Sequence, residues 1–127
     1  MNNCIFCDII EGRKSCRMLS EDDFWIGIYD EYPVSEGHAL LIPKRHVTTL
    51  SNLTHSEATA LYYNIRYITE LLMKKHNPNG FNIGVNQGEA AGQSIDHLHV
   101  HIIPRYTGDV ENPRGGVRGV IPEKQNY

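Results

Sequence analysis

The chain has 127 residues, of which 40% are hydrophobic and 21% charged, and its formal net charge is −3. This length suits one domain with its own core, so we expect a single domain over residues 1–127, with a core at about 4–106 and an irregular tail at 107–127. The slight negative charge gives no general attraction to nucleic acid or anionic membranes, and no apolar run approaches membrane-spanning length. We therefore expect neither a nucleic-acid partner nor a membrane partner.

The cysteines and the N-terminus favour a reducing compartment. Residues 1–8 contain no basic stretch and no long apolar stretch, so we expect no signal peptide and a cytoplasmic protein. Two of the three cysteines form Cys4-Ile5-Phe6-Cys7, which suits a metal or redox site better than a disulfide framework. Two thiols at this spacing can hold one zinc ion from a tight turn. A redox pair needs a preceding strand, and almost no chain precedes Cys4.

The first third of the chain predicts a short helix and three strands. The helix begins at about Asp8 and is stopped by Gly12. Cys16–Ser20 and Phe24–Tyr29 predict two strands joined by a polar turn, and therefore a hairpin. The short apolar run His38–Pro43 predicts a central strand. Cys16 has no nearby partner residue, and we interpret it as a small buried hydrophobic side chain.

A long helix follows. Thr54 with Glu57 three residues later is a capping-box signature, and the helix is expected to run to about His76. The residues expected to face the core are Ala58, Leu61, Ile65, Ile68 and Leu72. Three tyrosines, Tyr62, Tyr63 and Tyr67, flank this stripe, either as the edge of the core or as a surface for a partner helix.

The second half of the chain predicts a strand at Phe81–Asn86, a loop of small residues at Gln87–Gly92 and a final strand within Gln93–Arg105. Three strands, one long helix and two further strands are typical of an α+β domain with a mostly antiparallel sheet and a short N-terminal segment.

The final strand carries the most informative pattern. Residues 97–102 read His-Leu-His-Val-His-Ile. Because successive side chains of a strand point to opposite faces, the three imidazoles are expected on one face and the aliphatic side chains on the other. Three buried imidazoles are unfavourable without a metal, a phosphate or a proton network. The pattern therefore indicates a functional site.

Two chemistries suit this face. The first is a catalytic metal held by His-x-His, with water at an open position. The second is attack of one imidazole on phosphorus, which forms a phosphoramidate that water later opens. Gln93 and Ser94 lie just before the histidines, where an amide and a hydroxyl suit a phosphate or a bridging oxygen. The histidines alone do not choose between these chemistries.

The segment Gly92–Ile103 resembles the His-φ-His-φ-His-φ-φ signature of the histidine triad (HIT) family, in which φ is apolar. Cys4–Gly12 and Gly37–His46 also resemble segments of bacterial members, so the resemblance covers about residues 4–106. It implies an α+β fold and a homodimer whose long helices and central strands meet. It also implies nucleotidyl hydrolase or transferase activity at the α-phosphate of a nucleotide conjugate, without an organic cofactor.

The resemblance also implies roles for individual residues. His99, the middle histidine, resembles the nucleophile, and His101 resembles the triad member that contacts the α-phosphate. His38 resembles the upstream supporting histidine, and Asp30 resembles the carboxylate that accepts both ribose hydroxyls. The residues expected around the phosphates and the bridging oxygen are Asn86, Gln93 and Ser94.

The sequence indicates the substrate less specifically than the family. The exit Pro104-Arg105 and the tail at 108–118 resemble the branch that splits dinucleoside polyphosphates such as diadenosine tetraphosphate (Ap4A). The other large branch cleaves phosphoramidates such as adenylyl-lysine. Two further readings are a nucleotide-binding regulatory protein with little turnover and a metallohydrolase that uses all three histidines as ligands. In the polyphosphate reading, Arg114, Arg118 and Lys124 reach the substrate in their own or the neighbouring subunit's site.

A structural zinc site is predicted at Cys4, Cys7, His46 and His97. Two thiolates and two imidazoles form a closed tetrahedral site, which leaves no open position for catalysis. His97 is included because the first histidine of the similar motif in galactose-1-phosphate uridylyltransferases binds metal beside the nucleophile. Such a site would fix the N-terminal segment against the histidine strand.

Overall fold

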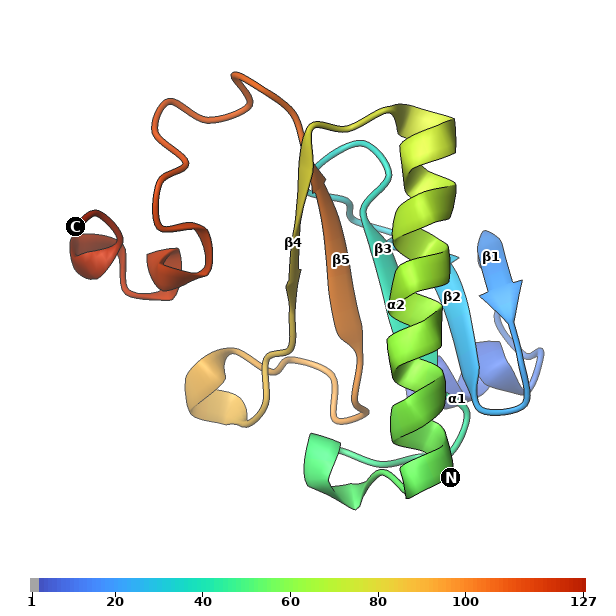
Figure 1. Ribbon diagram of the computed structural model, residues 1–127. Helices are drawn as coiled ribbons and strands as arrows, with labels where there is room; N and C mark the ends of the chain where they lie inside the picture. Colours follow the sequence, from blue (N-terminus) through green and yellow to red (C-terminus); the bar gives the residue numbers. More distant parts are fainter. Residues whose placement is uncertain (1–2) are drawn as a thin grey trace.

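The computed structural model describes residues 3–127 and consists mainly of a five-stranded antiparallel sheet with one long helix (Figure 1). The expectation of no signal peptide concerns residues 1–8. The first two of these, Met1 and Asn2, lie outside the described residues. The strand order is β1-β2-β3-β5-β4. The elements are α1 (Ile5–Ile10), β1 (Met18–Glu21), β2 (Trp25–Tyr29), β3 (Ala39–Pro43), α2 (His55–His76), β4 (Gly80–Gly84) and β5 (Val100–Arg105). The predicted α+β class is confirmed.

The central position of β3 brings the two halves of the chain together. β2 pairs with β3 from Trp25 opposite Pro43 to Tyr29 opposite Ala39. On its other side β3 pairs with β5, which sets Leu40 opposite His101. The predicted hairpin of β1 and β2 is confirmed, although β1 begins at Met18 and therefore leaves Cys16 outside the sheet.

Helix α2 begins and ends as its local signals predict. The Thr54 hydroxyl accepts a hydrogen bond from the backbone N–H of Glu57, and the Glu57 carboxylate accepts one from the backbone N–H of Thr54. The prediction that Ala58 faces the core is wrong, because Ala58 is exposed and Glu57 is the buried residue of the first turn. The Glu57 carboxylate pairs with Arg45 at 2.8 Å, and its carbonyl accepts from the indole N–H of Trp25. These partners bury Glu57 in place of Ala58 in the first turn, while the other predicted residues, Leu61, Ile65, Ile68 and Leu72, pack in the core.

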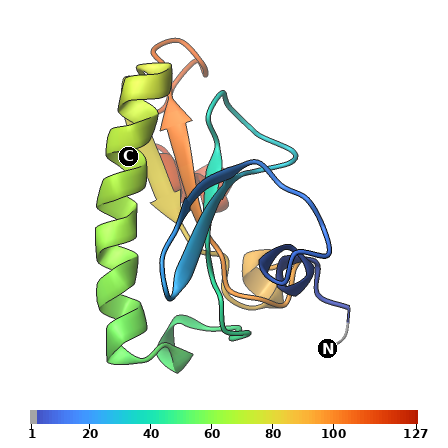
Figure 2. The ribbon, with the colours of Figure 1, turned by 90° about the vertical axis from the view of Figure 1, so that its right-hand side faces the viewer.

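The sheet buries an apolar layer on each face. The larger layer lies under α2 and includes Leu41, Ile68, Leu72 and the aliphatic residues of the histidine segment. The second layer lies under α1, on the opposite face, and contains Phe6 and Ile9 (Figure 2). Because α1 has only six residues, it covers one end of this face and leaves the neighbouring surface of β3 and β5 open.

The tail leaves β5 and lies beside β4, away from β1 and β2 (Figure 1). It contains two short 3-10 helices, Gly116–Val120 and Pro122–Lys124. The guanidinium groups of Arg114 and Arg118 lie 4.9 and 4.6 Å from the ring centre of Tyr127. Across residues 3–127, no helix has the length and apolar character needed to cross a membrane.

Candidate active site

A cavity of about 700 Å³ opens beside α1, on the face of the sheet that carries the histidines. Its wall is formed by α1, the loop at 14–17, the loop at 30–34 and the ends of the central strands. The predicted site residues that line it are Asp30, His38, Asn86, Ser94, His99 and His101. Residues distant in the sequence thus share one space large enough for a nucleotide.

The alternation predicted for the histidine segment is present, but most of it precedes the strand. β5 begins at Val100, so the prediction of a strand carrying all three histidines is wrong for His97 and His99. Leu98, Val100 and Ile102 still pack in the layer under α2. His99 and His101 therefore face the cavity, with ring centres 5.2 Å apart, while His97 lies deeper, beside the cysteines.

His99 is held in one tautomer. Its Nδ1 lies 2.8 Å from the backbone carbonyl of His97, and a carbonyl only accepts, so the Nδ1–H must donate. The neutral ring then carries its lone pair on Nε2. His99 is only 7% exposed, and the edge of its ring contacts Phe6. An oriented imidazole with its lone pair on Nε2 is the arrangement that a nucleophile needs.

His38 and His101 form a directed hydrogen-bond chain. The backbone N–H of Val34 donates to Nδ1 of His38 at 3.1 Å, so neutral His38 carries its proton on Nε2. That N–H lies 2.9 Å from Nδ1 of His101 and donates to it. His101 must then carry its own proton on Nε2. The chain therefore makes His101 a hydrogen-bond donor, which suits a phosphoryl oxygen or a departing group.

The same chain weighs against a metal held by Asp30, His38 and His101. Their donor atoms all lie within 4.8 Å of one another. To bind a metal, Nε2 of His38 would need its lone pair, so the proton would move to Nδ1. There it would point at the Val34 N–H, and that hydrogen bond would be lost. Nδ1 of His97 lies beside Cys4, and its Nε2–H donates to the Pro43 carbonyl. The three triad histidines thus do not aim at one point, which disfavours the metallohydrolase reading.

Burial keeps the rings of His38 and His101 neutral. Desolvation lowers the pKa of His101 to about 4, with further lowering from His99 and His38. Desolvation also lowers the pKa of His38, against the opposing influence of Asp30. At pH 7 both rings are therefore uncharged, as their hydrogen-bond chain requires.

We expect this shift to make the fold sensitive to acid. Between the ordinary histidine pKa of about 6.5 and about 4, the unfolded chain binds a proton at position 101 that the folded chain does not. The contribution of His101 to the free energy of unfolding therefore falls as the pH drops through this range. Urea denaturation at several pH values should show a shallower decline for His101→Asn than for the wild type. An NMR titration midpoint of His101 at 6 or above would contradict this expectation.

Asp30 lies at the cavity wall with both carboxylate oxygens oriented. Oδ1 accepts from the backbone N–H of Tyr32 at 2.8 Å, and Oδ2 lies 3.4 Å from Nε2 of His38. The loop that carries Asp30 is closed by its backbone N–H to the His38 carbonyl, and Ser35 fastens it to the Pro104 carbonyl. A half-buried carboxylate fixed in this way can still accept hydroxyl donors from a ribose.

The three residues predicted around the phosphates do not behave alike. Asn86 and Ser94 line the cavity. Gln93 does not, because its Oε1 accepts from the backbone N–H of Gly88 and its amide N–H₂ donates to the Ile95 carbonyl. Gln93 therefore fastens the loop that precedes the histidines. A direct contact of Gln93 with phosphate stays a prediction.

The apolar end of the cavity was not foreseen from the sequence. Ile5, Phe6 and Ile9 of α1 form one wall, and Ile28 and Leu40 of the sheet form another. The sequence predicts a turn at the cysteines and a helix only from about Asp8, whereas α1 begins at Ile5 because Cys4 caps it. The Cys4 sulfur accepts from the backbone N–H of Cys7 at 3.3 Å. The sequence signal that could have predicted this apolar wall is the pair of apolar residues, Ile5 and Phe6, between the two cysteines.

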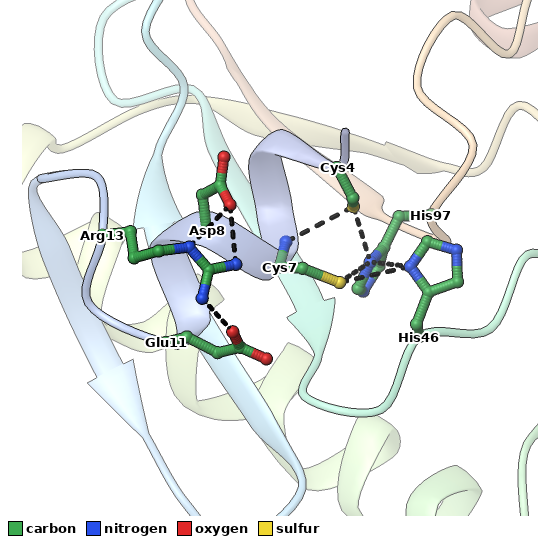
Figure 3. Close-up of polar contacts among 7 residues, drawn as sticks. All are labelled: Cys4, Cys7, Asp8, Glu11, Arg13, His46 and His97. Carbon is green, nitrogen blue, oxygen red and sulfur yellow. Dashed lines mark hydrogen bonds and ion pairs between the residues drawn. The ribbon is translucent and has the colours of Figure 1, made fainter. Parts of the chain in front are cut away.

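The predicted metal ligands form a second cluster (Figure 3), and Phe6, between the two cysteines in the sequence, lines the cavity. Cys4 Sγ lies 3.3 Å from His97 Nδ1, Cys7 Sγ lies 3.2 Å from His46 Nδ1, and the two Nδ1 atoms are 3.1 Å apart. A tetrahedral zinc site has donor–donor distances of about 3.3–3.8 Å, given the usual zinc–sulfur and zinc–nitrogen bonds. The donors therefore fit zinc in number and type, and the three distances lie at or slightly below this range, so a bound ion would need only a small outward movement of the donors.

Two details of this cluster suit a metal ion. The Nε2–H of His97 donates to the Pro43 carbonyl at 2.9 Å, which leaves Nδ1 unprotonated and aimed at the sulfur atoms. Without a metal, burial and the neighbouring Cys4 raise the pKa of the Cys7 thiol to about 11. A bound cation reverses that preference, because it favours the thiolate. On the outer side of α1, the exposed Arg13 forms ion pairs with Asp8 and Glu11 (Figure 3).

Comparisons with known proteins agree with this geometry. Residues 11–108 match the family model described as the HIT domain. The chain is 44% identical over 108 residues to adenylylsulfatase HINT3 of Arabidopsis thaliana, a match that covers 85% of this chain but only 55% of that protein. It is 34% identical to adenosine 5′-monophosphoramidase hnt1 of Schizosaccharomyces pombe, over 81% of this chain and 74% of that protein. The asymmetrical bis(5′-nucleosyl)-tetraphosphatase of the same yeast is 43% identical, over 61% of this chain and 42% of that protein.

Solved structures show the same fold. A crystal structure of a HIT family protein from Bacillus anthracis is 40% identical, with a TM-score of 0.79, and covers 83% of this chain and 74% of that one. A zinc-bound histidine triad family protein from Mycobacterium smegmatis is 33% identical, with a TM-score of 0.76, over 84% of this chain and 77% of that one.

Proposed function

This chain belongs to the HIT family, and from that premise we propose that it cleaves dinucleoside polyphosphates or related nucleotide conjugates at the α-phosphate through a nucleotidyl-histidine intermediate. The observation that carries the proposal is the orientation of His99. Its Nδ1–H is committed to the His97 carbonyl, so the Nε2 lone pair is available in a cavity that also holds the donor His101. A covalent mechanism needs this pairing of a nucleophile with an adjacent donor.

The cavity suggests how the nucleotide is oriented. In the proposed pose the base lies against Phe6 and Leu40, the ribose hydroxyls donate to Asp30, and the α-phosphate lies between His99 and His101. Asn86 and Ser94 are then near the phosphoryl oxygens. Each contact pairs an apolar group with an apolar wall or a donor with an acceptor.

In the first step Nε2 of His99 attacks the α-phosphorus. A nitrogen–phosphorus bond forms and the bond from phosphorus to the leaving oxygen or nitrogen breaks. The leaving group takes a proton from His101 or Ser94. The second nucleotide or the amine departs, and the nucleotide remains on His99.

In the second step water attacks the same phosphorus. The group that gave up its proton in the first step accepts one from the water, and the nitrogen–phosphorus bond breaks. The nucleoside monophosphate leaves, and His99 regains its lone pair. Both steps use only groups that line the cavity.

An adenosine phosphoramidase is the second candidate, and one observation favours it. Arg114 and Arg118 contact the ring of Tyr127 and are not among the residues that line the cavity. The predicted reach of these arginines to a polyphosphate would therefore require another subunit. The names of the relatives are also divided among adenylylsulfatase, phosphoramidase and tetraphosphatase. A nucleotide-binding protein with little turnover is the remaining alternative.

An activity panel tests these candidates. Purified protein is assayed with Ap3A, Ap4A, adenosine 5′-phosphoramidate, adenylyl sulfate and ADP, and products are identified by chromatography. We expect AMP and ATP from Ap4A, with the highest kcat/KM in the panel. A preference for the phosphoramidate would favour the second candidate. Tight AMP binding without multiple turnovers on any substrate would contradict the enzymatic proposal.

We further propose that Cys4, Cys7, His46 and His97 hold a structural zinc ion. Support comes from the spacing of the donors and from the zinc-bound relative of Mycobacterium smegmatis. Four protein donors would leave the metal no open position for substrate. The free, buried thiols also suit a reducing compartment, and on that ground we propose that the protein is cytoplasmic.

A homodimer is also proposed. The tyrosines at 62, 63 and 67 of α2 are 58%, 58% and 52% exposed, and β4 lies at the edge of the sheet. Exposed aromatic side chains on the long helix and a strand at the edge of the sheet suit a two-fold interface. Light scattering at micromolar concentration should give about twice the chain mass of 14.4 kDa. A mass near that of one chain would contradict the dimer.

A further inference from the structure

The turn that contains the cysteines faces two sites at once. Cys4 and Cys7 point to the metal cluster, whereas Ile5 and Phe6 between them line the cavity. Phe6 is only 4% exposed, and its ring centre lies 5.1 Å from that of His99 and 5.8 Å from that of His97. One short helix therefore fixes two metal donors, a wall of the cavity and a ring against the nucleophile.

His97 provides a second connection between the sites. Its Nδ1 lies 3.3 Å from the Cys4 sulfur, and its backbone carbonyl accepts from Nδ1–H of His99 at 2.8 Å. The ring of one residue thus belongs to the metal cluster, and its backbone sets the tautomer of the nucleophile. A change that shifts His97 alters the orientation of His99 as well.

Helix α1 is too short to order itself. Isolated helices of six residues are not stable in water, and the ion pairs of Arg13 on its outer side are exposed and contribute little. Its order depends on packing of residues such as Phe6 and on the donors at its start. A metal ion on the cluster would fix α1 before a nucleotide binds. Nucleotide binding would then cost less conformational entropy of the protein, because the cavity wall is already ordered.

We propose that Phe6 is a positioning residue that couples the metal cluster to the nucleotide cavity, so that zinc and a nucleoside monophosphate increase each other's affinity. The inference rests on the proposed zinc and nucleotide binding. Because coupling between two sites is reciprocal, zinc must raise AMP affinity by the same factor by which AMP raises zinc affinity. A zinc ion that only stabilised the fold would leave the zinc affinity and the AMP affinity independent of each other in the folded protein.

The test measures both affinities in the full chain. Calorimetry gives the Kd for AMP with and without zinc, and equilibrium competition with a chelator of known affinity gives the zinc Kd with and without AMP. We expect both factors to agree and to be about fivefold or more, the lower end of common coupling energies. A factor of one in folded, zinc-binding protein would overturn the inference and leave the proposed activity standing.

Two matched substitutions on α1 locate the coupling. Phe6→Leu keeps an apolar side chain but removes the ring that contacts His99, so the factor should fall toward one while zinc still binds. Ile10→Val is the control, because Ile10 packs against the same apolar layer but does not line the cavity. It should keep the wild-type factor. Equal factors for the two variants would overturn the role of Phe6, and a chain that takes up no zinc would overturn the metal site and the coupling together.

Discussion

Replacing His99 with alanine is expected to reduce kcat by about 10⁴-fold or more, the scale seen when a covalent nucleophile is removed from an enzyme. The physical reason is the loss of the Nε2 lone pair that the His97 carbonyl orients. AMP should still bind, because Asp30, His101 and the apolar wall remain. Steady-state kinetics with the best substrate of the panel and calorimetry with AMP measure the two effects.

The matched control for this variant is His55→Ala. His55 begins α2, is exposed and does not line the cavity, so its removal should leave kcat within about twofold, as is usual for surface substitutions. A His99→Gly protein adds a second check, because added imidazole fits the space left by the side chain and should restore part of the turnover. Near-normal kcat in His99→Ala would contradict covalent catalysis at this residue.

The double substitution Cys4→Ser, Cys7→Ser is expected to have the largest effect on stability. Loss of two thiolates leaves His46 and His97 unable to hold zinc by themselves, whereas a serine hydroxyl at position 4 can still cap α1, so the loss of stability reports on the metal. Elemental analysis should fall from about one zinc per chain to none. A loss of about 3 kcal/mol would lower Tm by about 10 °C in a domain of this size.

Cys16→Ser is the control for the thiol chemistry. Cys16 is a free cysteine outside the metal cluster, so this variant should keep its zinc and nearly all of its thermal stability. Wild-type protein purified without chelator yet free of metal would contradict the zinc proposal, as would a double variant with unchanged Tm.

Features that depend on neighbouring residues could be predicted from the sequence. The capping box of Thr54 and Glu57 and the hairpin of β1 and β2 arise from local signals, and each is present. The alternation around the histidines also correctly placed their aliphatic neighbours in the core. In each case the determining partners lie within a few residues, where backbone geometry limits the alternatives.

Features that depend on distant partners could not be predicted. The exposure of Ala58 follows from the pairing of Glu57 with Arg45, which belongs to the segment after β3. The early start of α1 follows from the sulfur cap at Cys4, an unusual capping residue. The role of His99 as a nucleophile does predict that a backbone carbonyl sets its tautomer, but no sequence pattern says which residue supplies that carbonyl, or which N–H orients His38. The engagement of the Gln93 amide in its own loop is equally invisible in the sequence.

The stereochemistry at phosphorus tests the proposed mechanism most directly. A substrate with a single configuration at an α-phosphorothioate is hydrolysed in isotopically labelled water, and the configuration of the product is determined by ³¹P NMR. Attack by His99 and then by water gives two in-line displacements, each of which inverts the phosphorus. The proposed mechanism therefore predicts overall retention, and overall inversion would contradict it because a single displacement by water inverts the phosphorus once.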